Sequence, residues 1–538
     1  MIKLARLQLL SLVVILPVIV SPSFSIDPTN PAKSLYLSCN LVFACILSVF
    51  LQRRSEKETV ALFWLLTLIL LMLLITHQIS FDTNSSQHIF GNVGRGTGWL
   101  LICQGLITFL FLNLSFRRYS EVLIKDFPKL LYLTNMIQLI ILSLQEFFQL
   151  FIYWDTSSQP IPVTTMSNPN YVSAILGISG IGCVHFLFES RRLIKFALVL
   201  QLLANVFLMT KLQSSQGFII LGLGFGIYSL IQSQRFWYVF SGLSSLGKYI
   251  SVVLSLAITF FFSLVLALQF ASELNLSARL DYWRAALRGI IKSPLVGNGF
   301  GSFGEQLPSL RDDQMAQRNY FSDSPHNIFL EIGYSVGLPV MVFTLWLWAY
   351  GFVRLLKFSS KSGGRNSSAL IVAVYVALTI QMTISPVEIS LFILMLVTLS
   401  FSLQIKLGET GSSKIALGES SPVISRRAER KRLTLKSRVA FLCLSLISLP
   451  IAALSFQSFV KDHEFRRAIE RGDGRELYNL ASSFPVDRSR YKFTIEVLMS
   501  NEYLEMAKLL AQSYILDFPN DSIAKQLNIL QESKDNKN

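Results

Sequence analysis

One polar segment of the sequence contains basic residues that could bind phosphate. Arg279 begins a pattern of apolar and charged residues typical of an amphipathic helix that ends near Lys292. Arg284 and Arg288 lie four residues apart, on one face of that helix. Residues 279–292 include four basic residues and one acidic residue, so the predicted helix has a net charge of +3. A guanidinium group can bind phosphate oxygens through two parallel hydrogen bonds, so this segment could hold a phosphorylated substrate.

His326 is the residue of this segment that could move a proton. It lies where the polar segment ends and a long apolar run begins. A neutral imidazole can accept a proton from a hydroxyl group, and the nearby arginines could hold a phosphate beside it. A single histidine, however, more often has a structural role than a catalytic one. The residues by themselves therefore leave two interpretations, a group that activates or orients a hydroxyl and a structural residue.

Glycines alternate with other residues just after the basic helix, at positions that include Gly297 and Gly299. Glycine adopts positive φ angles and lets backbone amides approach a ligand closely. The run follows a predicted helix and not a strand, so it lacks the context of a dinucleotide-binding fingerprint. Two interpretations remain, a ligand-binding turn and a turn packed against membrane helices.

The composition of the chain shows which elements must position these residues. Of 538 residues, 52% are apolar and 15% are charged, whereas soluble domains average about 25% charged residues. The mean hydropathy is +0.49. A bilayer core about 30 Å thick requires roughly 20 apolar residues for each helical span. We therefore predict an all-α polytopic membrane protein with about 13 transmembrane helices, near residues 5–21, 34–51, 59–77, 98–114, 130–152, 171–188, 193–210, 217–232, 249–270, 328–353, 368–385, 388–404 and 439–459.

The distribution of basic residues predicts the orientation of these spans. Lysine and arginine gather in alternate short loops, which places those loops and the N-terminus on the cytoplasmic side. The loop 271–327, the turn from Lys211 to Gln216 and the tail 460–538 then lie outside. The net charge of +15 is thus a topology signal, and we expect contact with anionic membrane lipids and not with nucleic acid.

The cysteines and histidines indicate neither a disulfide framework nor a metal site. The five cysteines lie in apolar segments, their number is odd, and no two of them are spaced as in a zinc-binding or redox motif. The five histidines are scattered. We therefore expect no metal and no cofactor.

The polar tail contains a short internal repeat. The sequence Phe-Pro-Val-Asp at 484–487 recurs as Phe-Pro-Asn-Asp at 518–521, an offset of 34 residues. This is the period of tetratricopeptide repeats, and each copy follows an apolar helical stretch. We predict a tetratricopeptide-like tail over 460–538, docked on the membrane domain 1–459 or on a protein partner. The alternative is a pair of unrelated prolines that end helices.

The region 210–345 resembles the signature region of the O-antigen ligase and O-antigen polymerase superfamily. That pattern consists of an arginine, an aromatic residue, a helix ended by proline, a Gly-x-Gly turn, a variable stretch, His-Asn and a glycine-containing membrane helix. The matching residues here are Arg279, Trp283, Pro294, Gly297, Gly299, His326, Asn327, Gly333 and Gly337. The pattern does not distinguish ligases from polymerases or from protein O-glycosyltransferases.

The resemblance implies an activity and roles for individual residues. It implies a metal-independent, inverting glycosyltransferase in the bacterial inner membrane. Its donor would be a glycan on undecaprenyl pyrophosphate, and its acceptor a lipid, a glycan or a protein. Arg279 would bind the pyrophosphate, and His326 would activate or orient the acceptor hydroxyl. Arg284 is a candidate second phosphate contact, the alternative being a solvated helix face, and Arg288 and Asn327 are further candidate substrate contacts.

One position departs from the family pattern. The family usually carries Ser-Arg-Gly at the outer start of the eighth span, whereas this chain has Gln216 at the arginine position. Glutamine can form a hydrogen bond with phosphate or sugar but has no charge. Lys211, five residues earlier, could supply part of the missing charge.

Two other functions compete with the glycosyltransferase. Some members of the family have been labelled bicarbonate carriers, and transporters place ionisable groups near mid-membrane. The predicted spans here are almost free of charge in their centres, with Lys195 and Glu331 near span ends, where their charged groups could reach the interface. The second alternative is an inactive envelope scaffold, which Gln216 and the repeat-like tail favour.

Overall fold

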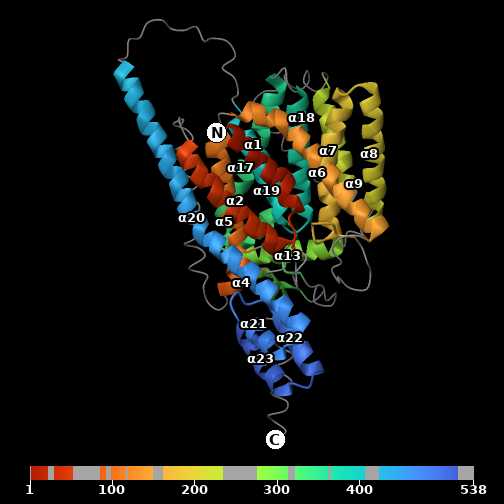
Figure 1. Cartoon of the computed structure of the whole chain (residues 1–538), viewed down its shortest axis with the longest axis vertical. Helices are drawn as coiled ribbons and strands as arrows, with labels where there is room; N and C mark the ends of the chain where they lie inside the picture. The colour runs from red at the N-terminus through yellow and green to blue at the C-terminus, as the bar shows by residue number, and fades with distance from the viewer. Residues whose placement is uncertain are drawn as a thin grey trace.

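The computed structural model describes residues 2–21, 29–51, 85–91, 98–116, 119–149, 162–233, 276–312, 322–361, 365–405 and 423–518. All regular elements in these ranges are helical (Figure 1), as predicted. The helices are α1 (Ile2–Leu10), a π-helical turn (Ser11–Ile15), a 3₁₀ turn (Leu16–Val18), α2 (Asn30–Leu51), α4 (Ser85–Phe90), α5 (Trp99–Phe116), α6 (Ser120–Phe148), α7 (Pro169–Glu189), α8 (Arg192–Lys211), α9 (Gln216–Gln232), α13 (Leu276–Lys292), α14 (Phe303–Leu310), α16 (Ile328–Val336), α17 (Leu338–Lys361), α18 (Arg365–Ile384), α19 (Ile389–Gln404), α20 (Val423–Arg471), α21 (Gly474–Ala481), α22 (Arg488–Ser500) and α23 (Leu504–Asp517).

The long apolar helices make this a polytopic membrane protein. Among the described residues, eight helices are long and apolar enough to cross a bilayer, and α9 and α19 are shorter apolar helices. The predicted spans 59–77 and 249–270 lie outside the described residues. The first predicted span, 5–21, is represented by α1 and the two short turns that follow it.

The tenth predicted span, 328–353, is two helices and not one. Gly337 separates α16 from α17 with φ 93° and ψ 166°, a conformation that is essentially restricted to glycine. A Cβ atom on Gly337 would lie 2.3 Å from the carbonyl oxygen of Leu295. The N–H of Leu338 donates to the carbonyl of Pro294 over 2.7 Å. The prediction of one helix was wrong because hydropathy does not register this break.

Small residues allow the central helices to pack closely. The apolar stretches of α5, α7 and α18 are largely enclosed, whereas α8 and α17 lie at the periphery and expose apolar side chains. Helices α7 and α9 meet at Gly217, where a Cβ atom would lie 2.3 Å from the carbonyl oxygen of Ser173. Such close contacts are typical of helix association in membranes.

The predicted outside segments lie at one end of the molecule. Figure 1 places α13 at the lower edge of the helix bundle and α21–α23 below it, on the side away from the N-terminus. The helix α20 contains 49 residues, equivalent to about 70 Å. It runs without interruption across residue 460, so the boundary predicted there falls inside a continuous helix.

The tail folds around its own small core and contacts the membrane domain. Helices α21–α23 pack with the end of α20 around Phe465, Leu477 and Tyr514. The ring of Phe484 lies 5.7 Å from that of Phe90 in α4, edge to face. The N–H of Val486 donates to the hydroxyl of Ser86 over 3.0 Å. Of the second copy of the predicted repeat, residues 519–521 lie outside the described residues.

Helix α4 also contacts the outside loop, so it joins that loop to the tail. The amide of Gln87 donates to the carbonyl of Gly301 over 3.0 Å, and Nδ1 of His88 donates to the carbonyl of Phe300 over 2.7 Å. Glu305 in α14 faces both Gln87 and Arg488 of the tail. Burial raises the pKa of Glu305 to about 7, although Arg488 and a hydrogen bond with Gln87 oppose the shift.

This pKa predicts a pH-dependent stability. The carboxyl of Glu305 binds a proton more tightly in the folded state, with a pKa of about 7 against a reference of 4.5. Its stabilising contribution is complete below about pH 4.5 and is lost as the pH rises through 7, by about 3 kcal/mol at most. Melting temperatures in detergent at pH 5.5 and 8.5 measure this, with Glu305→Gln as control. We expect the wild type to lose more stability than the variant between these values, and equal losses would contradict the assignment.

Candidate functional site

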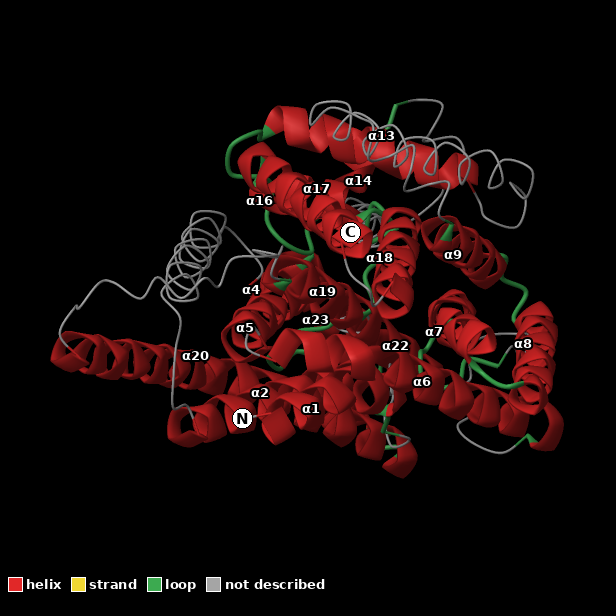
Figure 2. Cartoon of the chain, turned by 90° about the horizontal axis from the view of Figure 1, so that it is seen from above, coloured by secondary structure: helices red, strands yellow, loops and turns green. Residues whose placement is uncertain are grey.

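The basic helix predicted from the sequence is present as α13 and ends at Lys292 as predicted. Figure 2 shows α13 lying across one edge of the bundle, close to α14 and α16. Its buried face includes Tyr282, Ala285 and Ala286, which pack with Phe303 and other apolar residues of the loop. This packing fixes the rotation of α13 and so determines which of its charged side chains face inward.

Arg279 is the inward-facing arginine of α13. Its side chain is buried, with 7% exposed, and it interacts electrostatically with Tyr171 in the first turn of α7 and with Tyr282. Burial lowers the pKa of Arg279 to about 10, and the two tyrosines oppose the shift. The guanidinium is therefore still charged at neutral pH, in surroundings from which water is largely excluded.

His326 lies beside the same tyrosine. Its ring centroid is 5.5 Å from that of Tyr282, so Tyr282 has both Arg279 and His326 as neighbours. His326 has a φ of 58°, a rare backbone conformation for a residue other than glycine that is concentrated at functional sites. The N–H of His326 donates to the hydroxyl of Ser324 over 3.2 Å, which helps to hold this conformation.

Gln216 is the first residue of α9 and is fully buried. Its Oε1 accepts a hydrogen bond from the hydroxyl of Ser385 over 3.0 Å. Within the part of the chain that the structure describes, Nε2 of Gln216 and the hydroxyl of Ser215 have no hydrogen-bond partner. These buried donors stand at the N-terminus of α9, where the helix dipole favours an anion.

The first turn of α7 connects Gln216 with Arg279. The hydroxyl of Ser173 accepts a hydrogen bond from the N–H of Gly217 over 2.8 Å, and Ser214 donates to Asn170 over 2.7 Å. Tyr171, which interacts with Arg279, lies between Asn170 and Ser173 in the sequence. Gln216 and Arg279 therefore border the same turn, from α9 and from α13.

The other basic residues predicted to bind substrate have contacts of their own. The Arg284 side chain is 65% exposed, and its nearest acidic partner is Asp281 at 3.8 Å. Arg288 donates to Asp312 over 2.8 Å and to the carbonyl of Leu310 over 2.9 Å, which ties α13 to the end of α14. Lys211 pairs with Glu146 of α6 at 3.5 Å.

The glycine turn packs against the protein with its amides bonded. Gly297 and Gly299 have φ angles of 74° and 89°. The N–H of Gly297 donates to the carbonyl of Ser293, and that of Gly299 to the carbonyl of Ser335, both over 3.0 Å. These bonds hold the turn on the end of α16, which favours the interpretation of a packed turn.

Asn327 acts as the N-cap of α16. Its Oδ1 accepts hydrogen bonds from the N–H groups of Phe329 and Leu330 over 3.0 and 3.1 Å. This cap fixes the start of the helix directly after His326 and therefore the place of the imidazole.

Several polar residues around Tyr282 were not predicted from the sequence. Arg311 lies near Tyr282 and Asp281, and burial lowers its pKa while both neighbours oppose the shift. Tyr282 itself could have been found, because it follows Arg279 by three residues on one helix face. Glu331 is buried and accepts a hydrogen bond from Ser324 over 3.0 Å. The carboxylate of Glu331 thus has a hydrogen-bond partner in the loop directly before α16.

Comparison with known proteins gives a family match over part of the chain. Residues 196–345 match the family model Wzy_C, described as O-antigen ligase. The chain carries an O-antigen ligase domain. The matched range includes α9, α13, α14 and α16, and with them Gln216, Arg279 and His326. The resemblance seen in the sequence is confirmed over this range, and the match indicates a membrane glycan transferase. Searches of curated proteins and of solved structures gave no match.

The packing of the glycine turn predicts how a substitution there changes the stability of the protein. In Gly297→Ala the new Cβ would lie 2.4 Å from the carbonyl carbon of Ser335, at a φ of 74°. We expect this variant to lose about 2 kcal/mol or more and to show a lower melting temperature in detergent. Gly222→Ala is the matched control, because its Cβ would meet no atom within 4 Å and alanine favours the helix. Equal melting temperatures for the two variants would contradict the structural role of the turn.

Proposed function

We propose that this protein transfers a glycan from undecaprenyl pyrophosphate to an acceptor hydroxyl on the outer face of the bacterial inner membrane. The observation that carries the proposal is that Tyr282 has both Arg279 and His326 as neighbours. A phosphate-binding cation and a proton acceptor are the two groups that the reaction requires. In this topology the N-terminus is cytoplasmic, and the outside loop and the tail are periplasmic.

The donor pyrophosphate would lie between α13 and the N-terminus of α9. Arg279 is charged at neutral pH and largely desolvated, so it would strongly stabilise the negative charge of a leaving pyrophosphate. Gln216 and Ser215 supply buried hydrogen-bond donors where the family pattern has an arginine. Compared with the family pattern, the site would therefore hold the pyrophosphate with one positive charge fewer and with one additional neutral hydrogen-bond donor. Lys211, paired with Glu146, does not restore this charge.

His326 would act on the acceptor. A neutral imidazole takes the proton of the acceptor hydroxyl as its oxygen attacks the anomeric carbon of the donor sugar. The bond from that carbon to the pyrophosphate oxygen breaks, and undecaprenyl pyrophosphate leaves with the electron pair. Attack opposite the leaving group inverts the anomeric configuration. The N-cap at Asn327 and the bond from Ser324 keep the imidazole in place.

In vitro transfer from an undecaprenyl-pyrophosphate glycan tests this proposal. We expect Arg279→Gln to lower the rate about 100-fold or more and His326→Ala about 100-fold or more, with both variants folded. Arg284→Gln is the matched control, because its exposed side chain is expected to change the rate less than about threefold. Folded Arg279 and His326 variants with wild-type rates would refute the assigned roles.

The size of the products identifies the acceptor class. One discrete addition to a lipid core acceptor would identify a ligase of lipopolysaccharide biosynthesis, and a ladder would identify a polysaccharide polymerase. Addition to a polypeptide would identify a protein O-glycosyltransferase. Solute uptake into proteoliposomes without transfer would favour the transporter, and complementation by the His326 variant as effective as wild type would favour the scaffold.

A further inference from the structure

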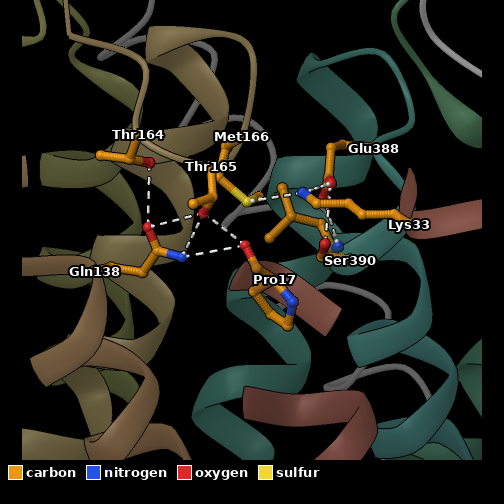
Figure 3. A network of polar contacts seen from close by, with 9 residues as sticks. Pro17, Lys33, Gln138, Thr164, Thr165, Met166, Glu388 and Ser390 are labelled. Atoms are coloured by element: carbon orange, nitrogen blue, oxygen red, sulfur yellow. Dashed lines mark hydrogen bonds and ion pairs between the residues drawn. The ribbon is translucent and has the colours of Figure 1, made fainter. Parts of the chain in front are cut away.

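A buried ion pair lies outside the residues that match the family. Nζ of Lys33 is 2.7 Å from Oε1 of Glu388, and the two side chains are 0% and 1% exposed (Figure 3). Lys33 lies near the start of α2 and Glu388 is the N-cap of α19. Desolvation of two charges is costly, and apolar replacements of such pairs are often as stable. Stability alone therefore gives little reason for this pair.

Glu388 fixes the connection between α18 and α19. Its Oε2 accepts the N–H of Leu391 over 2.9 Å, and its Oε1 accepts the hydroxyl of Ser390 over 3.0 Å. Together with Lys33, these contacts use both oxygens of the carboxylate. The short segment 385–388 is thus held at its α19 end by one charged group.

Ser385, at the other end of this segment, orients Gln216. Its N–H donates to the carbonyl of Gln381 over 3.1 Å, so the backbone of Ser385 is tied to α18. Its hydroxyl donates to Oε1 of Gln216. Because the amide oxygen is bound, Nε2 is the part of Gln216 left to bind another group. The position of the segment therefore determines where this donor points.

Lys33 also contacts the segment that leads into α7. Its Nζ donates to the sulfur of Met166 over 3.4 Å. The preceding Thr165 donates to the carbonyl of Pro17 over 2.6 Å and accepts from Gln138 over 3.0 Å, as Figure 3 shows. The chain then enters α7, whose first turn contains Tyr171, the neighbour of Arg279. One ammonium group thus contacts the segments that lead to both parts of the donor site.

We infer that Lys33 and Glu388 are positioning residues for donor binding. The pair fixes the segment 385–388, Ser385 then fixes the amide of Gln216, and this amide binds the lipid-linked pyrophosphate. The inference rests on the proposed function. It gives a reason for a charged pair at a place where apolar side chains could pack. The contacts of a charged pair are directional, so they fix where the segment 385–388 lies, whereas apolar packing only holds it close.

A double-mutant cycle tests the inference. Lys33→Met with Glu388→Gln removes both charges and leaves neither unpaired. Its dissociation constant for undecaprenyl-pyrophosphate glycan is measured with purified full-length protein in detergent, with KM and kcat for transfer alongside. We expect about tenfold weaker binding and a higher KM with little change in kcat. In a Gln216→Ala background, the same two changes should weaken binding less than twofold.

Two further variants complete the test. Ser385→Ala keeps the ion pair and should weaken donor binding to the same extent as the charge-free pair. Ser390→Ala removes one contact of Glu388 without leaving a charge unpaired, so it replaces the double variant in the binding test if that variant does not fold. It should weaken binding two- to threefold in wild type and not in the Gln216→Ala background. Arg6→Gln is the control, because it removes an exposed ion pair with Asp126 and should leave binding unchanged.

The outcomes separate the inference from the proposed function. An equal loss of binding with and without Gln216, or a loss of folded protein and kcat alone, would show a general structural role and overturn the inference. Wild-type protein that neither binds nor transfers the lipid-linked glycan would overturn the proposed function, and the inference with it.

Discussion

The candidate site depends on the burial of one guanidinium group between α13 and the membrane helices. Arg279 is held against Tyr282 and the first turn of α7. This position requires that the apolar face of α13 be packed on the loop, that α16 end at Gly337, and that His326 be fixed by its neighbours. A cation placed in this way interacts with a phosphate more strongly than one in water, because little solvent screens it.

The sequence predicted the helical class, the apolar helices, the basic helix and the two candidate residues that neighbour Tyr282. These features follow from composition, helical periodicity and a motif with fixed spacing. The break at Gly337 was missed because hydropathy averages over it. The ion pair of Lys33 and Glu388 was missed because the two residues lie 355 positions apart, and nothing in either local sequence indicates the other.

The candidate substrate contacts fall into two groups once their neighbours are known. Arg279 and Gln216 border the turn of α7 that connects them, whereas Arg288 and Asn327 are used to shape the loop. Charge alone could not make this distinction, because Arg279 and Arg288 belong to the same helix. The rotation of α13 about its axis makes the distinction, because it turns Arg279 inward and Arg288 toward α14. The apolar residues between the charged ones determine this rotation.

The continuous helix α20 has a mechanical consequence. It packs along α2, the helix that carries Lys33, and continues past its internal Pro450 into the tail. The tail is also fastened to α4, by the ring contact of Phe484 with Phe90 and by the hydrogen bond from Val486 to Ser86. Two connections therefore restrain its position. The tail is thus held at one position relative to α4 and to the outside loop that α4 contacts. A molecule bound to the tail would therefore lie at a fixed distance from the loop that carries Arg279 and His326.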